Sequence, residues 1–223
     1  MKRPASRVSA VGALAVLAAT ACATASAPAT ASAPATGLSP ATRTQAASGR
    51  PAYNAADVAF MSGMIVHHAQ AVLIAGWAPA HGASPAVRAL CERIVVGQRD
   101  EMAVMQRWLR ERQQPVPAAD PHGPMMPGMD QSMLMPGMLT QEQLTQLDGA
   151  RGPDFDRLFL TLMIQHHRGA LTMVRDLIDK PGAAREGLLF QVASDVSADQ
   201  TGEIDRMTRI LDALSHTPQR SPQ

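Results

Sequence analysis

The sequence predicts an all-α protein, an up-down bundle of four helices made of two repeated helical hairpins. Hydrophobic residues make up 46% of the 223 residues but aromatic residues only 3%, so the core must consist of aliphatic side chains and methionine. These side chains favour packed helices, whereas sheets are richer in β-branched and aromatic residues. Apolar residues recur at helical spacing in four segments, and two motifs occur twice in the same order.

Residues 1–21 predict a signal peptide. Lys2, Arg3 and Arg7 are basic, and the apolar run that follows, residues 8–21, is too short to span a membrane as a mature helix. We therefore expect an exported protein, located in the periplasm or at the cell surface.

The residues around Cys22 predict a lipid anchor. Small side chains directly before this cysteine resemble a bacterial lipoprotein cleavage site, at which Cys22 becomes the lipidated first residue. Ala19 stands where such sites usually carry leucine, so ordinary cleavage nearby is the alternative. Residues 22–52 are rich in Ala, Thr, Ser and Pro, have few large apolar side chains and predict a flexible tether.

The charge and the cysteines of the mature chain give no support for nucleic-acid binding or for an internal disulfide. Removal of residues 1–21 takes away three basic and no acidic side chains, so the formal net charge changes from +1 to −2. A nearly neutral chain gives no electrostatic reason to expect nucleic-acid binding. With Cys22 lipidated or removed, Cys91 has no partner, so we expect no internal disulfide and a buried, structural Cys91.

Two motifs recur in the two halves of the chain. The first contains Phe, Met, Ile, two adjacent His and Ala, and it occurs at residues 60–71 and again at 159–170. The second is Gln-x-x-Glu followed by apolar residues at helical spacing, and it begins at Gln98 and again at Gln200. Because the order is the same and the separation nearly so, the sequence predicts a duplicated helical hairpin.

Helical spacing and breaker residues predict the bounds of the four long helices. We expect them near residues 54–78, 85–113, 153–179 and 184–214. Ser84 followed by Pro85 is typical of a helix start, with the serine as N-cap and the proline in the first helical position. The short connections within each half predict antiparallel neighbours. The bundle is thus expected over residues 53–215, followed by a tail at 216–223.

The longer middle segment, residues 114–152, differs in character from the helices. Residues 140–147 predict a short helix that begins with a capping box of Thr140 and Gln143. Upstream, methionines alternate with Pro and Gly in an exposed loop, where they are either soft-metal ligands or unstructured filler. The candidate auxiliary ligands are His122, Met125, Met126, Met129, Met133, Met135 and Met138.

Four polar positions fall on the inward face of the predicted helices. Glu101 and Glu203 follow the apolar spacing, as do Gln98 and Gln200. An inward carboxylate is unfavourable unless it is paired or contacts a metal. The natural partners are the histidine pairs of the preceding helices, so we expect these four residues to orient imidazoles that converge in the core.

The candidate metal ligands are His67, His68, His166 and His167. Met64 and Met163 lie one turn before each pair, close enough on a helix to share a ligand. Di-iron proteins of the ferritin type use Glu-x-x-His at this spacing, and the thioether in place of a carboxylate favours Cu(I) over iron. Imidazoles alone would also suit Cu(II) or Zn(II). His81 and His216 are predicted to be surface residues.

These motifs resemble the domain-of-unknown-function 305 family over residues 53–214. The resemblance rests on the two His-His motifs, the Gln-x-x-Glu segments and Gly137-Met138-Leu139-Thr140 ahead of Asp154-Phe155. It implies a ferritin-like up-down bundle in an exported or membrane-tethered protein, and a copper-binding role has been proposed for some family members. Leu160 stands at the position that matches Met61, so the two half-sites need not be equivalent.

Three functional hypotheses follow. The first is an extracytoplasmic binding protein that sequesters copper or passes it on, without turnover. The second is an enzyme, a ferritin-like oxidase that acts on a metal ion or oxygen, although such sites usually have more carboxylates than two. The third is a metal-free interaction module in which the His and Glu side chains serve packing alone. No catalytic residue is assigned.

Overall fold

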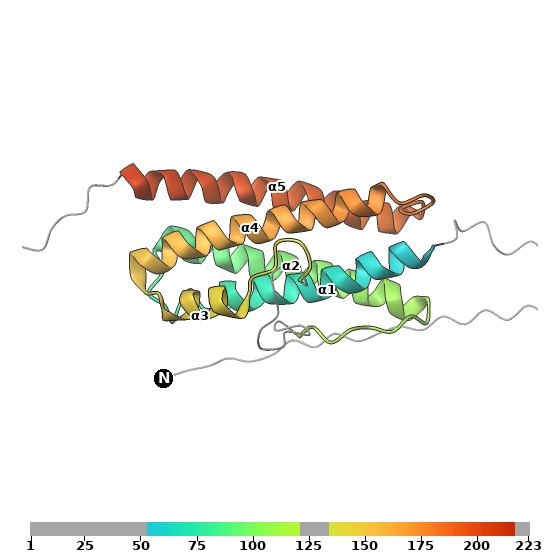
Figure 1. The fold of residues 1–223 in the computed structure, drawn as a ribbon, viewed down its shortest axis with the longest axis horizontal. Coiled ribbons are helices and arrows are strands. Elements are labelled where there is room, and N and C mark those ends of the chain that lie inside the picture. The colour runs from blue at the N-terminus through green and yellow to red at the C-terminus, as the bar shows by residue number, and fades with distance from the viewer. Residues whose placement is uncertain (1–52, 121–133, 217–223) are drawn as a thin grey trace, which may run out of the picture. The chain divides into compact units, whose positions relative to one another are not determined.

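The computed structural model describes residues 53–120 and 134–216, and these residues form five helices (Figure 1). The helices are α1 (Ala55–Gly76), α2 (Pro85–Glu111), α3 (Gln141–Gly149), α4 (Gly152–Ile178) and α5 (Gly187–His216). No strand occurs in the described residues, which confirms the all-α prediction. The predicted signal peptide, Cys22 and tether lie outside them.

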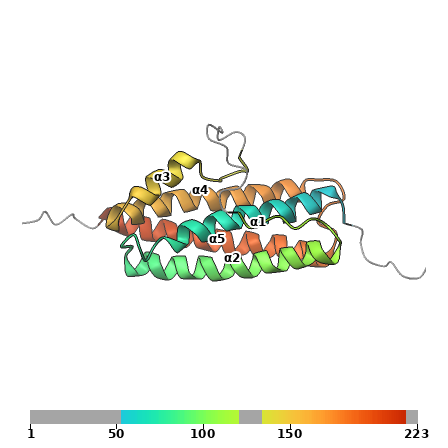
Figure 2. The ribbon, with the colours of Figure 1, turned by 90° about the horizontal axis from the view of Figure 1, so that it is seen from below.

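The four long helices form a bundle in which every helix is antiparallel to its two neighbours. α1 packs against α2 and α4, and α5 also packs against α2 and α4. α2 and α4 run in the same direction, so the chain returns along the bundle between them (Figure 1). A single long crossover of this kind is typical of ferritin-like bundles. α3 lies beside α4, on the side of the bundle away from α2 (Figure 2).

Local capping fixes the starts of three helices. Asn54 caps α1 in a capping box with Asp57. Ser84 caps α2 by accepting from the backbone N–H of Val87, with proline in the first turn, as predicted. The predicted capping box of Thr140 and its glutamine partner starts α3. These side chains satisfy backbone donors that the first helical turn leaves unpaired.

Two helix ends differ from the prediction because non-glycine residues adopt left-handed backbone conformations. Gln113 has φ 55°, so α2 ends at Glu111 rather than near residue 113. Ala184 has φ 54° and its N–H donates to Oδ1 of Asp57 at 2.8 Å, so α5 begins only at Gly187. Positive φ is unfavourable for side chains with a Cβ and stops a right-handed helix.

The core consists of two apolar clusters, one toward each end of the bundle. One contains Phe155 and Phe159 with the C-terminal half of α1 and the N-terminal half of α2. The other contains Phe60 and Trp108 with the C-terminal half of α4 and the N-terminal half of α5. α1 is long and apolar enough to span a membrane by length and composition, but 61% of that stretch is buried in the bundle, as in a core helix.

Candidate metal centre

A layer of polar side chains separates the two apolar clusters. Along α1 the layer lies between Ile65 of one cluster and Ala71 of the other, and along α4 between Ile164 and Ala170. His67, His68, His166 and His167 occupy this layer, each with an exposed fraction of 0%. The layer is completed from α2 and α5 by Gln98, Glu101, Gln200 and Glu203.

The imidazoles of the two halves converge in this layer, as the sequence predicts. The ring centroids of His67 and His166 lie 3.9 Å apart, with the ring planes tilted by 39°. Within each pair the centroids are 6.5 Å apart for His67 and His68, and 6.2 Å for His166 and His167. The repeated motif therefore builds one central group of imidazoles from two helices.

One imidazole of each histidine pair is hydrogen-bonded to a glutamate. Nε2 of His68 lies 2.6 Å from Oε2 of Glu101, and Nε2 of His167 lies 2.6 Å from Oε2 of Glu203. The glutamate side chains are 15% and 20% exposed, so they link the buried rings to the edge of the bundle. An ionised carboxylate only accepts hydrogen bonds, so it places the imidazole proton on Nε2.

The inner imidazole of α1 is held by a backbone carbonyl instead. Nε2 of His67 donates to the oxygen of Pro136 at 2.9 Å, since a carbonyl can only accept. Burial lowers the pKa of His67 to about 3, with the nearby His68 contributing in the same direction. Burial also lowers the pKa of His166, well below its usual range, and that of His167, where Glu203 opposes the shift.

All four imidazoles have at least one ring nitrogen without a hydrogen-bond partner. Nδ1 of all four histidines lacks a hydrogen-bond partner among the described residues, and so does Nε2 of His166. An unpaired buried polar atom disfavours folding by ~1–3 kcal/mol. A histidine that binds a metal through one nitrogen usually donates its other N–H to a carboxylate or carbonyl, and His67, His68 and His167 have that arrangement.

The donor chemistry fits a metal ion, although the rings are not in a coordinating arrangement. Within residues 53–120 and 134–216, no three His, Cys, Asp or Glu side chains already surround a common metal position. The tilted faces of His67 and His166 lie against each other, whereas a metal binds a nitrogen lone pair in the plane of the ring. Binding between these two rings therefore requires them to turn.

Residues 135–139 of the crossover, which we call the strap, contact α1 and α4 at the level of the polar layer. The side-chain amide of Gln70 makes two hydrogen bonds with the backbone of Leu139. It donates to the oxygen of Leu139 at 3.1 Å and accepts from the N–H of Leu139 at 2.7 Å. Gly137 adopts φ +77°, and Gly169 of α4 faces it without a side chain. The strap carries the carbonyl of Pro136 that holds His67.

We expect Gly169→Ala to displace the strap. A Cβ at this position would lie 1.9 Å from the oxygen of Pro136, and both partners are backbone, so neither can move without shifting an element. Loss of the bonds to His67 and Gln70 should lower the free energy of unfolding by ~2–4 kcal/mol. Gly149→Ala is the matched control because a Cβ there meets no described atom within 4 Å. Equal denaturation midpoints for the two variants would contradict this account.

The comparison with known proteins agrees with the sequence motifs. The profile of DUF305, a domain of unknown function, matches residues 57–211. The chain belongs to this family. No curated protein matches it in sequence.

Solved structures of DUF305 proteins share the fold. A candidate secreted DUF305 protein from Streptomyces coelicolor is 27% identical with a TM-score of 0.61, over 74% of this chain and 98% of the other. A DUF305 fragment from Deinococcus radiodurans is 29% identical with a TM-score of 0.61, over 73% and 99%. CopM in its Cu(II)-bound form is 26% identical with a TM-score of 0.56, over 70% and 96%. The Cu(I)-bound form of CopM gives 26% and 0.53 over the same shares.

The methionines of this DUF305 chain occupy different surroundings. Met64 and Met163 are fully buried, one in each apolar cluster, and their role as ligands stays a prediction. Met138 is only 2% exposed and Met135 is half-buried, so the prediction of exposed loop methionines is wrong for the strap, which packs against the bundle. The other candidates lie outside the described residues: His122, Met125, Met126, Met129 and Met133.

The prediction that His81 is a surface residue is wrong. Its side chain is buried between Trp77 and Phe155, with ring centroids 5.8 and 5.0 Å away. Nδ1 donates to the oxygen of Trp77, and Nε2 lies 3.1 Å from Oδ1 of Asp148, so His81 ties the end of α1 to the end of α3. His216 is exposed, as predicted.

Cys91 is buried, as the sequence predicts. It is 2% exposed, and burial raises the pKa of its thiol to about 12. A thiol that stays protonated at physiological pH is a weak nucleophile and a weak metal ligand. Cys91 therefore fills the core and takes no part in the polar layer.

Proposed function

We propose that this DUF305 protein is an extracytoplasmic copper-binding protein, which sequesters copper or passes it on without turnover. The observation that supports this most directly is the group of four buried imidazoles with unpaired Nδ1 atoms in the described structure. Three of them have the opposite nitrogen held by Glu101, Glu203 or Pro136. Imidazoles whose Nδ1 lacks a partner, and whose opposite nitrogen is held by a carboxylate or a carbonyl, are suited to donate to a metal ion.

Copper is the metal that the donor set favours. Imidazoles bind Cu(II) and Zn(II), and the thioethers of Met64 and Met163, one turn away on the same helices, shift the preference toward Cu(I). CopM, which shares this fold at 26% identity, has been solved with Cu(I) and with Cu(II). Glu101 and Glu203 would then act by orienting His68 and His167 rather than by binding the ion themselves.

The proposed location is outside the cytoplasm. The basic and apolar N-terminal residues have the composition of a signal peptide, and Cys22 is placed for a lipid anchor. A family member of similar fold is described as a candidate secreted protein. Methionine and histidine are sensible copper ligands in an oxidising compartment, where free thiols would form disulfides.

The proposal is tested by copper titration of a variant in which all four histidines of the layer are alanine. We expect the affinity for Cu(I) and Cu(II) to fall by at least about 100-fold, since losing even one supporting group around a metal site costs about 10–100-fold. His216→Ala, at an exposed histidine, is the matched control and should bind as wild type does. Far-UV circular dichroism checks that the variant folds, and equal affinities of folded variant and wild type would overturn the proposal.

A further inference from the structure

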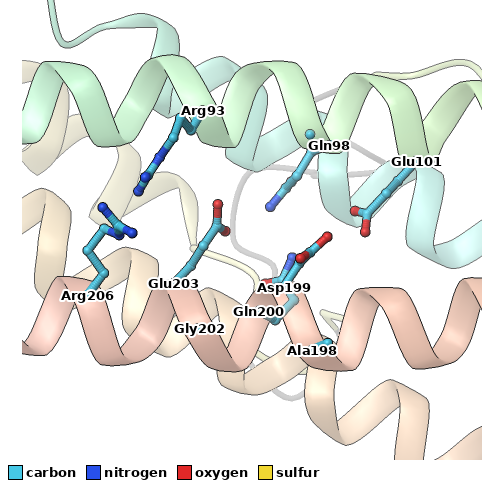
Figure 3. A pocket seen from close by; sticks show the side chains of 10 residues that line it. Arg93, Gln98, Glu101, Ala198, Asp199, Gln200, Gly202, Glu203 and Arg206 are labelled. Atoms are coloured by element: carbon cyan, nitrogen blue, oxygen red, sulfur yellow. The ribbon is translucent and has the colours of Figure 1, made fainter.

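A pocket of about 360 Å³ opens between α2 and α5, at the level of the polar layer (Figure 3). Glu101 and Glu203, the partners of His68 and His167, line it from opposite walls. These two glutamates therefore separate the pocket from the imidazoles of His68 and His167. The pocket connects the solvent to the buried layer.

Buried amides face this pocket without partners. Gln98 is 3% exposed, and neither its Nε2 nor its Oε1 has a hydrogen-bond partner in the described part of the chain. Gln200 is 1% exposed, and its Oε1 is unpaired in the same residues, as is Oε1 of Glu101. Figure 3 shows Gln98 and Glu101 directed from α2 toward α5. Polar atoms placed in this way can bond water or the hydration shell of an ion that passes.

Two glycines widen the opening. Gly97 of α2 and Gly202 of α5 line the pocket, and a Cβ at either position would meet no described atom within 4 Å. Alanine would therefore fit, and it favours a helix interior by about 0.5–1 kcal/mol over glycine. Glycine at these two positions adds no side chain to the gap between the helices, at the cost of helix stability.

The other sides of the layer are more closely packed within the described structure. The antiparallel pairs α1–α2 and α4–α5 are in more extensive contact than α2 and α5 are. On the side of α1 and α4, the strap packs backbone to backbone against Gly169. Toward each end of the bundle an apolar cluster with buried aromatic rings covers the layer.

We propose that this pocket is the passage through which copper exchanges between the solvent and the imidazoles; this inference rests on the proposed copper binding. Carboxylates of Glu101, Asp199 and Glu203 attract a hydrated cation, and the amide oxygens of Gln98 and Gln200 replace part of its water. His68 and His167 lie behind the glutamates with Nε2 toward the carboxylates, so the ion must pass these side chains to reach the unpaired Nδ1 atoms.

The charges around the pocket give the passage a preferred end. Arg93 and Arg206 lie together at the end near Glu203, whereas Asp199 lies with Glu101 at the other (Figure 3). Burial together with the charges of Glu101 and Glu203 raises the pKa of Asp199, so these carboxylates act on one another. Cations should therefore approach past Asp199.

The passage is tested by blocking it with Gly202→Trp and following copper exchange. Stopped-flow transfer of Cu(I) to and from the chelator bicinchoninate gives the rates of release and uptake. We expect both rates to fall by about tenfold or more, equivalent to ~1.4 kcal/mol in the barrier, while the equilibrium affinity stays at the wild-type value. Thr201→Trp, at an exposed neighbouring residue outside the pocket, is the matched control and should exchange at the wild-type rate.

Two further variants keep the test decisive. Gly97→Leu narrows the pocket from the other wall and replaces Gly202→Trp if that variant fails to fold. Asp199→Asn should slow uptake at low salt, with the difference shrinking as salt screens the charge. Wild-type exchange rates in folded Gly202→Trp and Gly97→Leu would overturn the passage while leaving copper binding intact. A wild-type protein that binds no copper would instead overturn the proposed function.

Discussion

Lowering the pH from 7 to 4 is expected to destabilise the metal-free bundle steeply. Burial holds the pKa of His67 at about 3 in the folded protein, against 6.5 in the unfolded chain. Between these values the unfolded chain binds a proton that the folded protein does not, so stability is full above pH 6.5 and is lost as the pH falls toward 3. His166 and His167 shift in the same direction.

The expected slope is ~1.4 kcal/mol per pH unit for each histidine that titrates only in the unfolded chain. Three such histidines give an upper limit of ~4 kcal/mol per unit, a large share of the ~5–15 kcal/mol by which domains are usually stable. Urea unfolding in the presence of a chelator, at intervals from pH 7 to pH 5, measures this before most carboxylates titrate. A free energy of unfolding that stays constant over this range would show that the imidazoles are already charged or solvated.

The helical period of the sequence was sufficient to predict the polar layer. His67 and Gln98 fall on apolar stripes, and a polar residue on such a stripe must face the core. Because the same motif occurs twice, the two histidine pairs had to come from equivalent helices, and a bundle brings equivalent helices together. The layer depends on local spacing and on a motif that occurs twice, and a single sequence contains both.

The strap could not be predicted in the same way. Its position depends on Gln70 finding a backbone partner 69 residues away, and no local pattern specifies that pairing. Gly169 does give a signal, since glycine within a helix is unfavourable unless another backbone approaches closely. The same signal at Gly97 and Gly202 indicates an open pocket instead. A mid-helix glycine thus predicts a special environment without saying which kind.

His81 and the two shifted helix ends show a related limit. His81 is buried because the ends of α1 and α3 meet, and that contact is tertiary. Gln113 and Ala184 adopt positive φ although neither is glycine, so the sequence lacks the usual indication of a helix end at these positions. The tertiary bond from Ala184 to Asp57 outweighs its local preference.

Replacing His166 by leucine is expected to stabilise the protein while removing copper binding. Its ring is fully buried, packs against His67, and has both nitrogens unpaired among the described residues. Leucine has a similar volume and no polar atoms, so it removes the unfavourable burial of two polar groups. We expect the free energy of unfolding to rise by ~1–3 kcal/mol at pH 7, and by more at pH 5, where His166 would gain a proton on unfolding.

His67→Leu is the matched control, because His67 donates to Pro136 and its loss leaves that carbonyl unpaired. This variant should lose copper affinity without gaining stability. Chemical denaturation and copper titration of both variants separate the two effects. A gain in stability together with a loss of copper affinity in His166→Leu would indicate that the imidazole of His166 serves metal binding at the expense of stability. Should His166→Leu be less stable than wild type at pH 7, His166 already has a partner, and the copper proposal loses its main support.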